Sequence, residues 1–258
     1  ADIREVMHIP ILTSIWRILA GIDGGLESAW QVVRPIMSSG AADAALCDLK
    51  TTARFPAPDP LTAERLDDFA VTSGDISSAL IIVEAYTRSN SLNLLALLNL
   101  VAERTRRSAS ESPEFTASTE PKWPTSSELP ELQKLNDKSE IDPDTWDLLE
   151  RIKYIGSQTD TPVIATLWRH LAEWPGLLSL IIESWEPLQT DGSLHRSIEE
   201  NYEVATRIAG ELPTPATETR NIPPDAMNLI KSYVGDPAAV NHMVVIGHGL
   251  RSWLRSTR

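Results

Sequence analysis

Apolar residues recur at helical spacing along most of this chain. Between Ile9 and Ala20 they return every three or four residues, which is the period of one helix face. A second run of this kind extends from about Leu26 to Pro35, after a glycine-rich turn. No segment alternates between apolar and polar residues for long enough to indicate a strand. We therefore predict an all-α protein.

Two segments are apolar almost all round, namely Leu92–Val101 and Ala238–Ile246. A helix without a polar face is a buried helix. We expect several amphipathic helices to wrap around each of these two central helices. Asp142-Pro143 and Thr161-Pro162 each place a capping residue before a proline, which is favoured at the first helical position. Further helices are therefore predicted to begin at these two prolines.

The firmest pattern is an internal repeat at a shift of 152 residues. Between residues 10–40 and 162–192, nine of 31 positions are identical, where about two are expected from ordinary residue usage. The identical pairs are Pro10 and Pro162, Trp16 and Trp168, Arg17 and Arg169, Leu19 and Leu171, Ala20 and Ala172, Gly24 and Gly176, Leu26 and Leu178, Pro35 and Pro187, and Gly40 and Gly192. We predict two tandem helical repeats that pack as a pseudo-dimer about an approximate two-fold axis.

A stretch of different composition separates the two copies. Residues 109–145 contain five prolines, many Ser and Thr, and nine acidic residues against three basic ones. Such a segment has too little apolar surface to order itself, so we predict an extended, acidic, Pro/Ser-rich linker. The predicted organisation is a helical repeat at 1–108, the linker at 109–145 and a second helical repeat at 146–258.

Composition limits the partners of this protein. The chain is 42% hydrophobic with a formal net charge of −13, and it lacks the clustered cations that nucleic acids and anionic membranes attract. Apolar runs such as Val240–Ile246 are far shorter than the ~20 residues of a membrane span. Cys47 is the only cysteine and no secretory leader is visible, so we expect a cytoplasmic protein that binds neither nucleic acid nor membrane.

The doubled Trp-Arg-x-Leu-Ala helix resembles the group I, or DL-, 2-haloacid dehalogenases. The likeness is carried by Thr161–Ala172 and its counterpart Ile9–Ala20, each followed by a glycine turn and an apolar helix. These dehalogenases are all-α proteins of two tandem repeats joined by a linker. The resemblance implies that fold, together with hydrolytic dehalogenation of small 2-haloacids or related chemistry on a small carboxylate.

One position departs from the family pattern. In the dehalogenases an aspartate of the second repeat, just before the aromatic-Arg pair, activates the attacking water. Leu167 stands at that position here, and Ile15 is its counterpart in the first repeat. Neither side chain can accept a proton, and general-base catalysis typically contributes about 10²–10⁴-fold. The resemblance therefore supports the fold and argues against the family's reaction.

The repeated motif supplies candidates for binding a small organic acid. Trp16, Trp168 and Leu167 could line an apolar pocket, although tryptophan at helical spacing is more often part of a core. Arg169 could bind a carboxylate. Because Arg17 repeats it in the first copy on a helix that looks buried, a structural arginine with a paired charge is the alternative.

Polar residues within the apolar helices are the remaining candidates. Asn93 and Tyr86 could supply polar groups to a pocket, whereas asparagines such as Asn93, Asn99 and Asn241 could instead bond one helix to another. No catalytic residue is identified, and His242 is the best titratable candidate. The five histidines show no metal-ligand spacing, and phosphate-binding glycine motifs are absent, so no metal or cofactor is predicted.

Two functions remain open at this point. The first is an enzyme that resembles the haloacid dehalogenases and uses a base not yet located. The second is a non-catalytic family member that acts as a small-ligand-binding or protein-binding helical scaffold. A ligand-sized pocket with converging polar groups favours the first, and packed side chains favour the second. A homodimer is compatible with both.

Overall fold

The computed structural model describes residues 2–106, 132, 135–213 and 221–256, and in this part of the chain every regular element is a helix. The prediction of an all-α protein is confirmed. The α-helices are α1 (Asp2–Met7), α2 (Ser14–Leu19), α3 (Gly25–Ser38), α4 (Ala41–Thr52), α5 (Ala63–Asp68), α6 (Ser73–Arg106), α7 (Pro143–Ile152), α8 (Thr166–Leu171), α9 (Pro175–Thr190), α10 (Ser193–Glu211), α11 (Pro224–Val234) and α12 (His242–Arg255). Across the described residues, none of these helices combines the length and apolar character needed to cross a membrane.

The chain forms two compact units, and each is assembled from three separate segments. The first unit comprises Ala1–Arg54, Arg88–Leu129 and Glu199–Asn241, and the second comprises Phe55–Thr87, Pro130–Ile198 and His242–Arg258. Each unit thus contains residues from both of the predicted repeats. The division of the chain into repeats at 1–108 and 146–258 stays a prediction. Most of the predicted linker at 109–145 lies outside the described residues.

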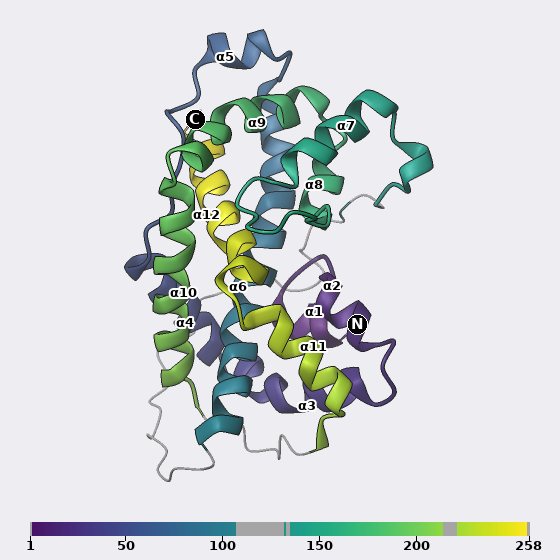
Figure 1. Cartoon of the computed structure of the whole chain (residues 1–258), viewed down its shortest axis with the longest axis vertical. Coiled ribbons are helices and arrows are strands. Elements are labelled where there is room, and N and C mark those ends of the chain that lie inside the picture. Colours follow the sequence, from purple (N-terminus) through teal and green to yellow (C-terminus); the bar gives the residue numbers. More distant parts are fainter. Residues whose placement is uncertain (1, 107–131, 133–134, 214–220, 257–258) are drawn as a thin grey trace. The chain divides into compact units, whose positions relative to one another are not determined.

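In the first unit, α3 packs against α1, α2 and α4, and α11 packs against α2 and α3 (Figure 1). The residues of α6 from Ser89 to Leu100 are all buried, as expected of a central helix. The apolar run predicted at Leu92–Val101 therefore does form the core of this unit. Because this stretch of α6 is buried on every face, it has no stripe of charged residues facing solvent.

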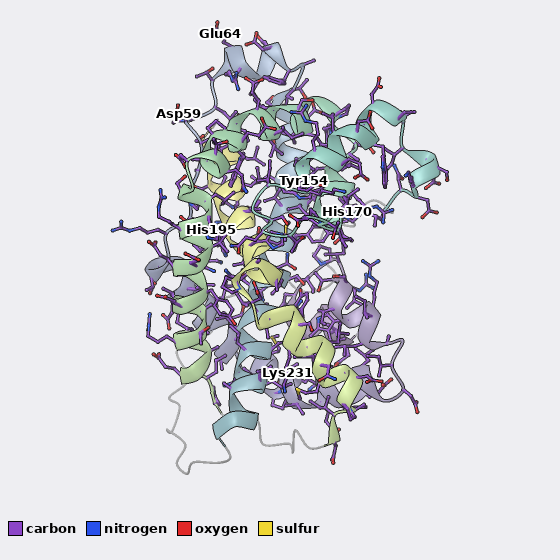
Figure 2. The ribbon with its side chains drawn as sticks, in the orientation of Figure 1. Asp59, Glu64, Tyr154, His170, His195 and Lys231 are labelled. Atoms are coloured by element: carbon purple, nitrogen blue, oxygen red, sulfur yellow. The ribbon has the colours of Figure 1, made fainter. Side chains whose placement is uncertain are left out.

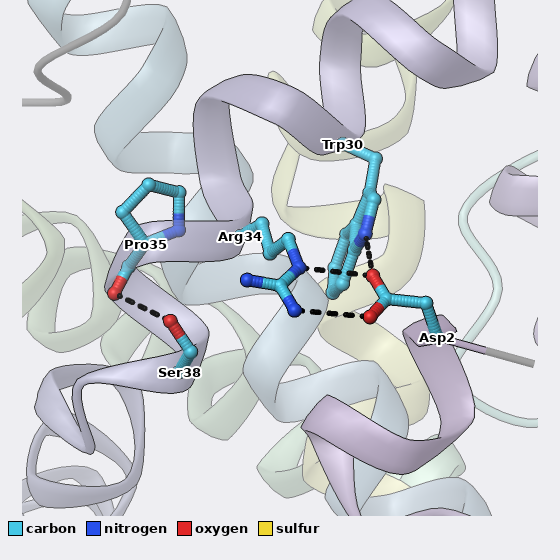
Figure 3. Close-up of polar contacts among 5 residues, drawn as sticks. All are labelled: Asp2, Trp30, Arg34, Pro35 and Ser38. Atoms are coloured by element: carbon cyan, nitrogen blue, oxygen red, sulfur yellow. Dashed lines mark hydrogen bonds and ion pairs between the residues drawn. The ribbon is translucent and has the colours of Figure 1, made fainter.

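The short helix α1 is attached to α3 through one carboxylate. Asp2 accepts hydrogen bonds from Arg34 Nε and Nη2, both at 3.0 Å, and from Trp30 Nε1 at 2.6 Å (Figure 3). These donors lower the pKa of Asp2, with the Arg34 hydrogen bond the largest cause. At its other end, α1 is fixed by Arg88 Nε, which donates to the Met7 carbonyl at 2.8 Å.

In the second unit, α7, α8 and α9 pack against one another (Figure 1). The helix α12 approaches α6 closely at Gly247, where an added Cβ would lie 2.5 Å from the Thr87 hydroxyl oxygen. Residues 243–250 of α12 are all buried. The predicted central helix at Ala238–Ile246 is interrupted: α12 starts only at His242, and the separate helical turn before it, Pro237–Asn241, contains a kink at Ala239.

The predicted helix starts are right in one case and wrong in two. Asp142 caps α7 by accepting from the Thr145 amide at 2.9 Å, and Pro143 is the first helical residue. The other two helices start only at Ser14 and Thr166, four residues after Pro10 and Pro162. The backbone just before each helix is extended, with ψ of 162° at Thr13 and 144° at Ala165. The residues between each proline and its helix form no regular element, and a local proline signal does not reveal how long such a segment is.

Candidate functional site

Asn93 is the centre of a buried polar group in the first unit. Its Oδ1 accepts a hydrogen bond from Trp16 Nε1 at 3.0 Å, and its Nδ2 donates to the Thr13 hydroxyl at 2.8 Å. Thr13 is 2% exposed, and Trp16 and Asn93 are fully buried. The helices α2 and α6 therefore meet through hydrogen bonds between side chains rather than through apolar contact alone.

Tyr233 brings α11 to the same amide. The Asn93 side chain hydrogen-bonds the Tyr233 hydroxyl, which is buried although the residue as a whole is only half-buried. Burial raises the pKa of Tyr233 far above its ordinary value, and the Asn93 hydrogen bond offsets only part of that rise. Tyr233 is therefore a neutral phenol at every ordinary pH. We call Thr13, Trp16, Asn93 and Tyr233 the Asn93 cluster.

The polar side-chain atoms of the cluster bond to one another and to a neighbouring serine. The Asn93 carbonyl oxygen and amide nitrogen are both engaged within the cluster. Thr13 accepts from Asn93 and, at 3.4 Å, from the Ser89 hydroxyl. In the described part of the chain, no buried polar side-chain atom of the cluster is without a hydrogen-bond partner.

An aromatic pair forms the apolar side of the cluster. Trp30 meets Trp16 edge to face, with ring centroids 5.5 Å apart and an interplanar angle of 82°. The Trp30 indole is held in turn by its hydrogen bond to Asp2. The Trp16 ring is therefore fixed on one side by Asn93 and on the other by a neighbour that is itself anchored.

The structure brings two of the six predicted binding residues, Trp16 and Asn93, into this cluster. Sequence reasoning missed Thr13 and Tyr233. Thr13 looked like part of a continuous helix, and Tyr233 lies in a segment that carried no motif. Nothing in the pattern of the sequence links either residue to Asn93, because the contacts depend on how α2, α6 and α11 pack.

A second polar pair lies in the other unit, where the Tyr86 hydroxyl and His170 Nδ1 are 2.7 Å apart. His170 is labelled in Figure 2. Their rings are tilted, with centroids 5.6 Å apart, and both residues are buried. Tyr86 was a candidate from the sequence, whereas His170 was not, because its spacing matched no metal or catalytic motif. The pair connects α6 to α8.

Three further candidates from the sequence lie on α8 beside His170. Leu167 and Trp168 are each 1% exposed and belong to the apolar core of the second unit. Arg169 donates from Nη2 to the carbonyl oxygen of Asn136, and its buried Nε has no hydrogen-bond partner among the described residues. Arg169 thus carries the backbone contact of a structural arginine together with one unused donor.

The remaining candidates fall into structural roles or outside the Asn93 cluster. Asn99 donates to the carbonyls of Ala209 and Leu212, and Asn241 accepts from Asn201, so both amides bond helices together. His242 is the half-buried first residue of α12. The expectation that Arg17 lies buried is wrong: Arg17 is exposed, because its position on α2 points away from the core formed by Ile15, Trp16 and Leu19.

Within the residues described, no three His, Cys, Asp or Glu side chains come together in a way that could hold a metal ion. The chemistry available to the Asn93 cluster is therefore that of neutral hydrogen-bond donors beside an indole ring. Comparison of the chain with protein-family models and with curated proteins found no match.

Proposed function

We propose that this chain is a two-repeat helical protein of the 2-haloacid dehalogenase type that binds a small acyl compound at the Asn93 cluster and does not hydrolyse it by the aspartate route. Small acyl compounds here include organic acids and their uncharged derivatives. The proposal has three parts, namely the duplicated fold, the binding site and the absence of the family's base.

The bounds of the helices support the duplication. The shift of 152 residues carries α2, Ser14–Leu19, onto α8, Thr166–Leu171, at both ends. It also carries the last residue of α3 onto the last residue of α9, and the first residue of α4 onto the first residue of α10. The glycines before α4 and α10, Gly40 and Gly192, have nearly equal positive φ values of 78° and 74°.

The composition of the two units supports a pseudo-dimer whose copies exchange segments. Shifted back by 152 residues, the 199–241 segment of the first unit becomes 47–89, close to the 55–87 segment of the second unit. Shifted forward, 88–106 becomes 240–258, close to the 242–258 segment of the second unit. Each unit then contains the corresponding three pieces, two from one copy and one from the other. The acidic stretch at 109–145 would join the copies.

The observation that carries the binding site is its presence in only one copy. Under the same shift, Thr13, Asn93 and Tyr233 correspond to Ala165, Val245 and Ile81, none of which has a polar side chain. Trp16 alone keeps its identity, as Trp168. A buried polar network that the fold itself required would be expected in both copies. Its restriction to one copy therefore favours a ligand as the reason for it.

The same residues argue for binding without hydrolysis. Leu167 and Ile15, which stand where the family's aspartate is expected, are 1% and 0% exposed. The Asn93 cluster contains no carboxylate or imidazole, and Tyr233 is a neutral phenol. Without a group that can take a proton from water, the water cannot be activated for attack.

Calorimetric titration tests the binding site. We expect small acyl compounds, tested as 2-chloropropionate and 2-chloropropionamide, to release or absorb heat with the wild-type chain. Thr13→Val, which keeps the shape and removes one hydroxyl donor, should weaken binding about 10-fold. The matched control is Thr87→Val, which removes another buried hydroxyl, one that donates to the Val83 carbonyl in the second unit. Equal affinity of both variants would contradict the site.

Halide release tests the chemistry separately. Purified protein should release no halide from either enantiomer of 2-chloropropionate above the rate without protein. Enzymatic release that survives dialysis and scales with protein concentration would overturn the non-hydrolytic part of the proposal and leave the binding site to be judged by calorimetry.

A further inference from the structure

We propose that Arg169 is a binding site for the carboxylate group of a small organic compound, and that residues 135–140 form a strap that occupies this site until such a ligand displaces it. The strap ends in the helical turn Lys138–Glu140, just before α7. The inference goes beyond the function proposed above, because Arg169 and the strap belong to the second unit and the Asn93 cluster belongs to the first.

Arg169 differs from the other half-buried arginines of the described residues in lacking a counter-charge. Arg65, Arg88 and Arg251 each bond to a carboxylate, at 2.8, 2.6 and 3.3 Å. Across the described residues, the Arg169 side chain makes no ion pair, and its hydrogen bond goes to the uncharged backbone carbonyl of Asn136. A sheltered charge is costly unless an opposite charge lies beside it. An anion is therefore the partner that this guanidinium lacks.

The unused donor of Arg169 fits the shape of a carboxylate. The Nε and Nη2 groups of a guanidinium donate side by side and match the two oxygens of one carboxylate. Arg34 shows the complete arrangement, since its Nε and Nη2 donate to the two carboxylate oxygens of Asp2, both at 3.0 Å (Figure 3). In Arg169, Nη2 donates to the Asn136 carbonyl, whereas the buried Nε has no partner among the described residues. A carbonyl thus fills one half of a fork that a carboxylate fills completely.

The strap has few attachments to lose when it leaves Arg169. Its residues 136–140 are exposed. Its second contact is that of Lys138, whose Nζ lies 4.5 Å from the centroid of the Trp146 ring on α7. A cation–π contact at an exposed position is weak. A ligand that supplies both a second hydrogen bond and a negative charge can therefore replace the strap at Arg169.

The strap also keeps its own hydrogen bonds when it moves. The Asp137 amide donates to the Glu140 carboxylate at 2.6 Å, and the Glu140 amide donates to the Asp137 carbonyl at 2.9 Å. Because these bonds lie within the turn, the turn can separate from Arg169 as one piece. Only the Asn136 carbonyl loses its donor, and water can replace that donor at the exposed surface.

The charges around Arg169 favour a single negative charge on the ligand. One guanidinium balances one carboxylate, whereas a phosphate dianion carries a second charge that needs further donors. The strap itself carries the acidic residues Asp137 and Glu140 close to the Arg169 contact. Their charges oppose a second negative charge on the ligand. A monocarboxylate is thus the class of ligand that this site fits.

Nuclear magnetic resonance of the isotope-labelled full chain at pH 7 tests the site. During titration with propionate, the Nε–H resonance of Arg169 and the carbonyl-carbon resonance of Asn136 should shift together, with one saturation curve. Propionamide has the same shape without the charge and should shift neither resonance. No saturable shift of Arg169, or an equal response to propionamide, would overturn the site. A shift of Arg169 without Asn136 would overturn displacement of the strap, and tighter binding of phosphate would overturn the ligand class.

Variants show whether the fork of Arg169 is responsible. Arg169→Lys keeps the charge and removes the fork, so the propionate concentration that shifts the Asn136 resonance by half should rise at least ~10-fold. Arg17→Lys is the matched control, because Arg17 is the corresponding residue of the first copy and is exposed. It should leave the response unchanged, as should Thr13→Val, which alters only the Asn93 cluster. An equal response of Arg169→Lys and Arg17→Lys would overturn the proposal and leave the Asn93 cluster to its own test.

Discussion

Asn93 joins three helices of one unit through a single amide. Asn93 lies on α6. Its partner Trp16 lies on α2, Thr13 directly precedes α2, and Tyr233 lies on α11. The hydrogen bonds from Trp16 and to Thr13 span 77 and 80 residues of sequence. The amide is therefore a tertiary link, and its loss affects the packing of several elements at once.

Replacing Asn93 by leucine should destabilise the protein by about 2–3 kcal/mol, because the Trp16 indole loses its acceptor while Trp16 and Thr13 stay buried. Urea unfolding followed by far-UV circular dichroism measures the change. Asn136→Ala is the control: the side chain of Asn136 is exposed and only its backbone carbonyl is used, by Arg169. A change below about 0.5 kcal/mol for Asn93→Leu would show that the network carries no stability.

The buried pair of Arg88 and Asp43 should contribute far more than an exposed pair. Asp43→Ala leaves the Arg88 charge buried without its carboxylate, and we expect a loss of about 3–5 kcal/mol in the free energy of unfolding. Asp2→Ala removes the partner of an Arg34 side chain that is 48% exposed, and its effect should be clearly smaller. Similar losses for the two variants would contradict the importance of burial.

The attachment of α1 should depend on pH through Asp2. The pKa of Asp2 is lowered in the folded state, so its carboxylate adds stability above its unfolded pKa, near 3.9, and this stability is lost as pH falls through the lowered folded value. The wild-type chain should thus be more stable than Asp2→Asn at pH 7, and the two should converge as pH falls from about 5 toward 2. Urea unfolding of both proteins at each pH measures the difference.

At the scale of single residues, the sequence predicts which polar and aromatic residues lie in the core better than it predicts which residues they bond to. Trp16 and Asn93 were recognisable because one is repeated and the other interrupts an apolar helix. Thr13 and Tyr233 were not, because their role depends on hydrogen bonds to a residue far away in the chain. Tyr86 was recognisable, but its partner His170 was not, for the same reason.

At the scale of helices, the sequence predicts that a helix forms better than it predicts the residues at which that helix begins. The central helix around Asn93 and the capped start of α7 were both predictable from local patterns. The starts of α2 and α8 were not, because the apolar residues after Pro10 and Pro162 continue the helical period although they precede the helices, and Val163 among them is 89% exposed. The kink at Ala239 follows Gly235 and Pro237. A prediction made from apolar residues alone takes no account of these two residues, so it missed the interruption.

The contact of α12 with α6 should tolerate no side chain at Gly247. An alanine there would place its Cβ 2.5 Å from the Thr87 hydroxyl oxygen, which is held by its bond to the Val83 carbonyl at 2.6 Å. We expect Gly247→Ala to cost about 1–3 kcal/mol, measured by urea unfolding. Gly74→Ala is the control, since its Cβ would meet nothing nearer than 3.5 Å and alanine favours the helix. Equal stability of the two variants would show that α12 can shift.

At the scale of the whole molecule, neither half of the sequence contains a complete unit. The first unit needs residues 199–241, and the second needs residues 55–87. We therefore expect the fragments 1–129 and 130–258 to lack cooperative unfolding transitions when each is expressed alone, and to recover one when mixed. Circular dichroism during urea titration measures this. A cooperative transition in either isolated fragment would show that a unit does not need all three of its segments.

Because each unit is assembled from three separate segments, the first unit cannot complete its folding until late in translation. The first unit lacks its last segment until residue 241 has left the ribosome, long after α6 has been synthesised. At roughly 5–20 residues per second, that interval lasts on the order of 10 s. During it, the apolar surface of α6 between Ser89 and Leu100 has no native cover from the later segments. Nascent chains of this protein should thus be clients of ribosome-associated chaperones, with the dependence strongest while the chain lengthens from residue 106 to residue 241.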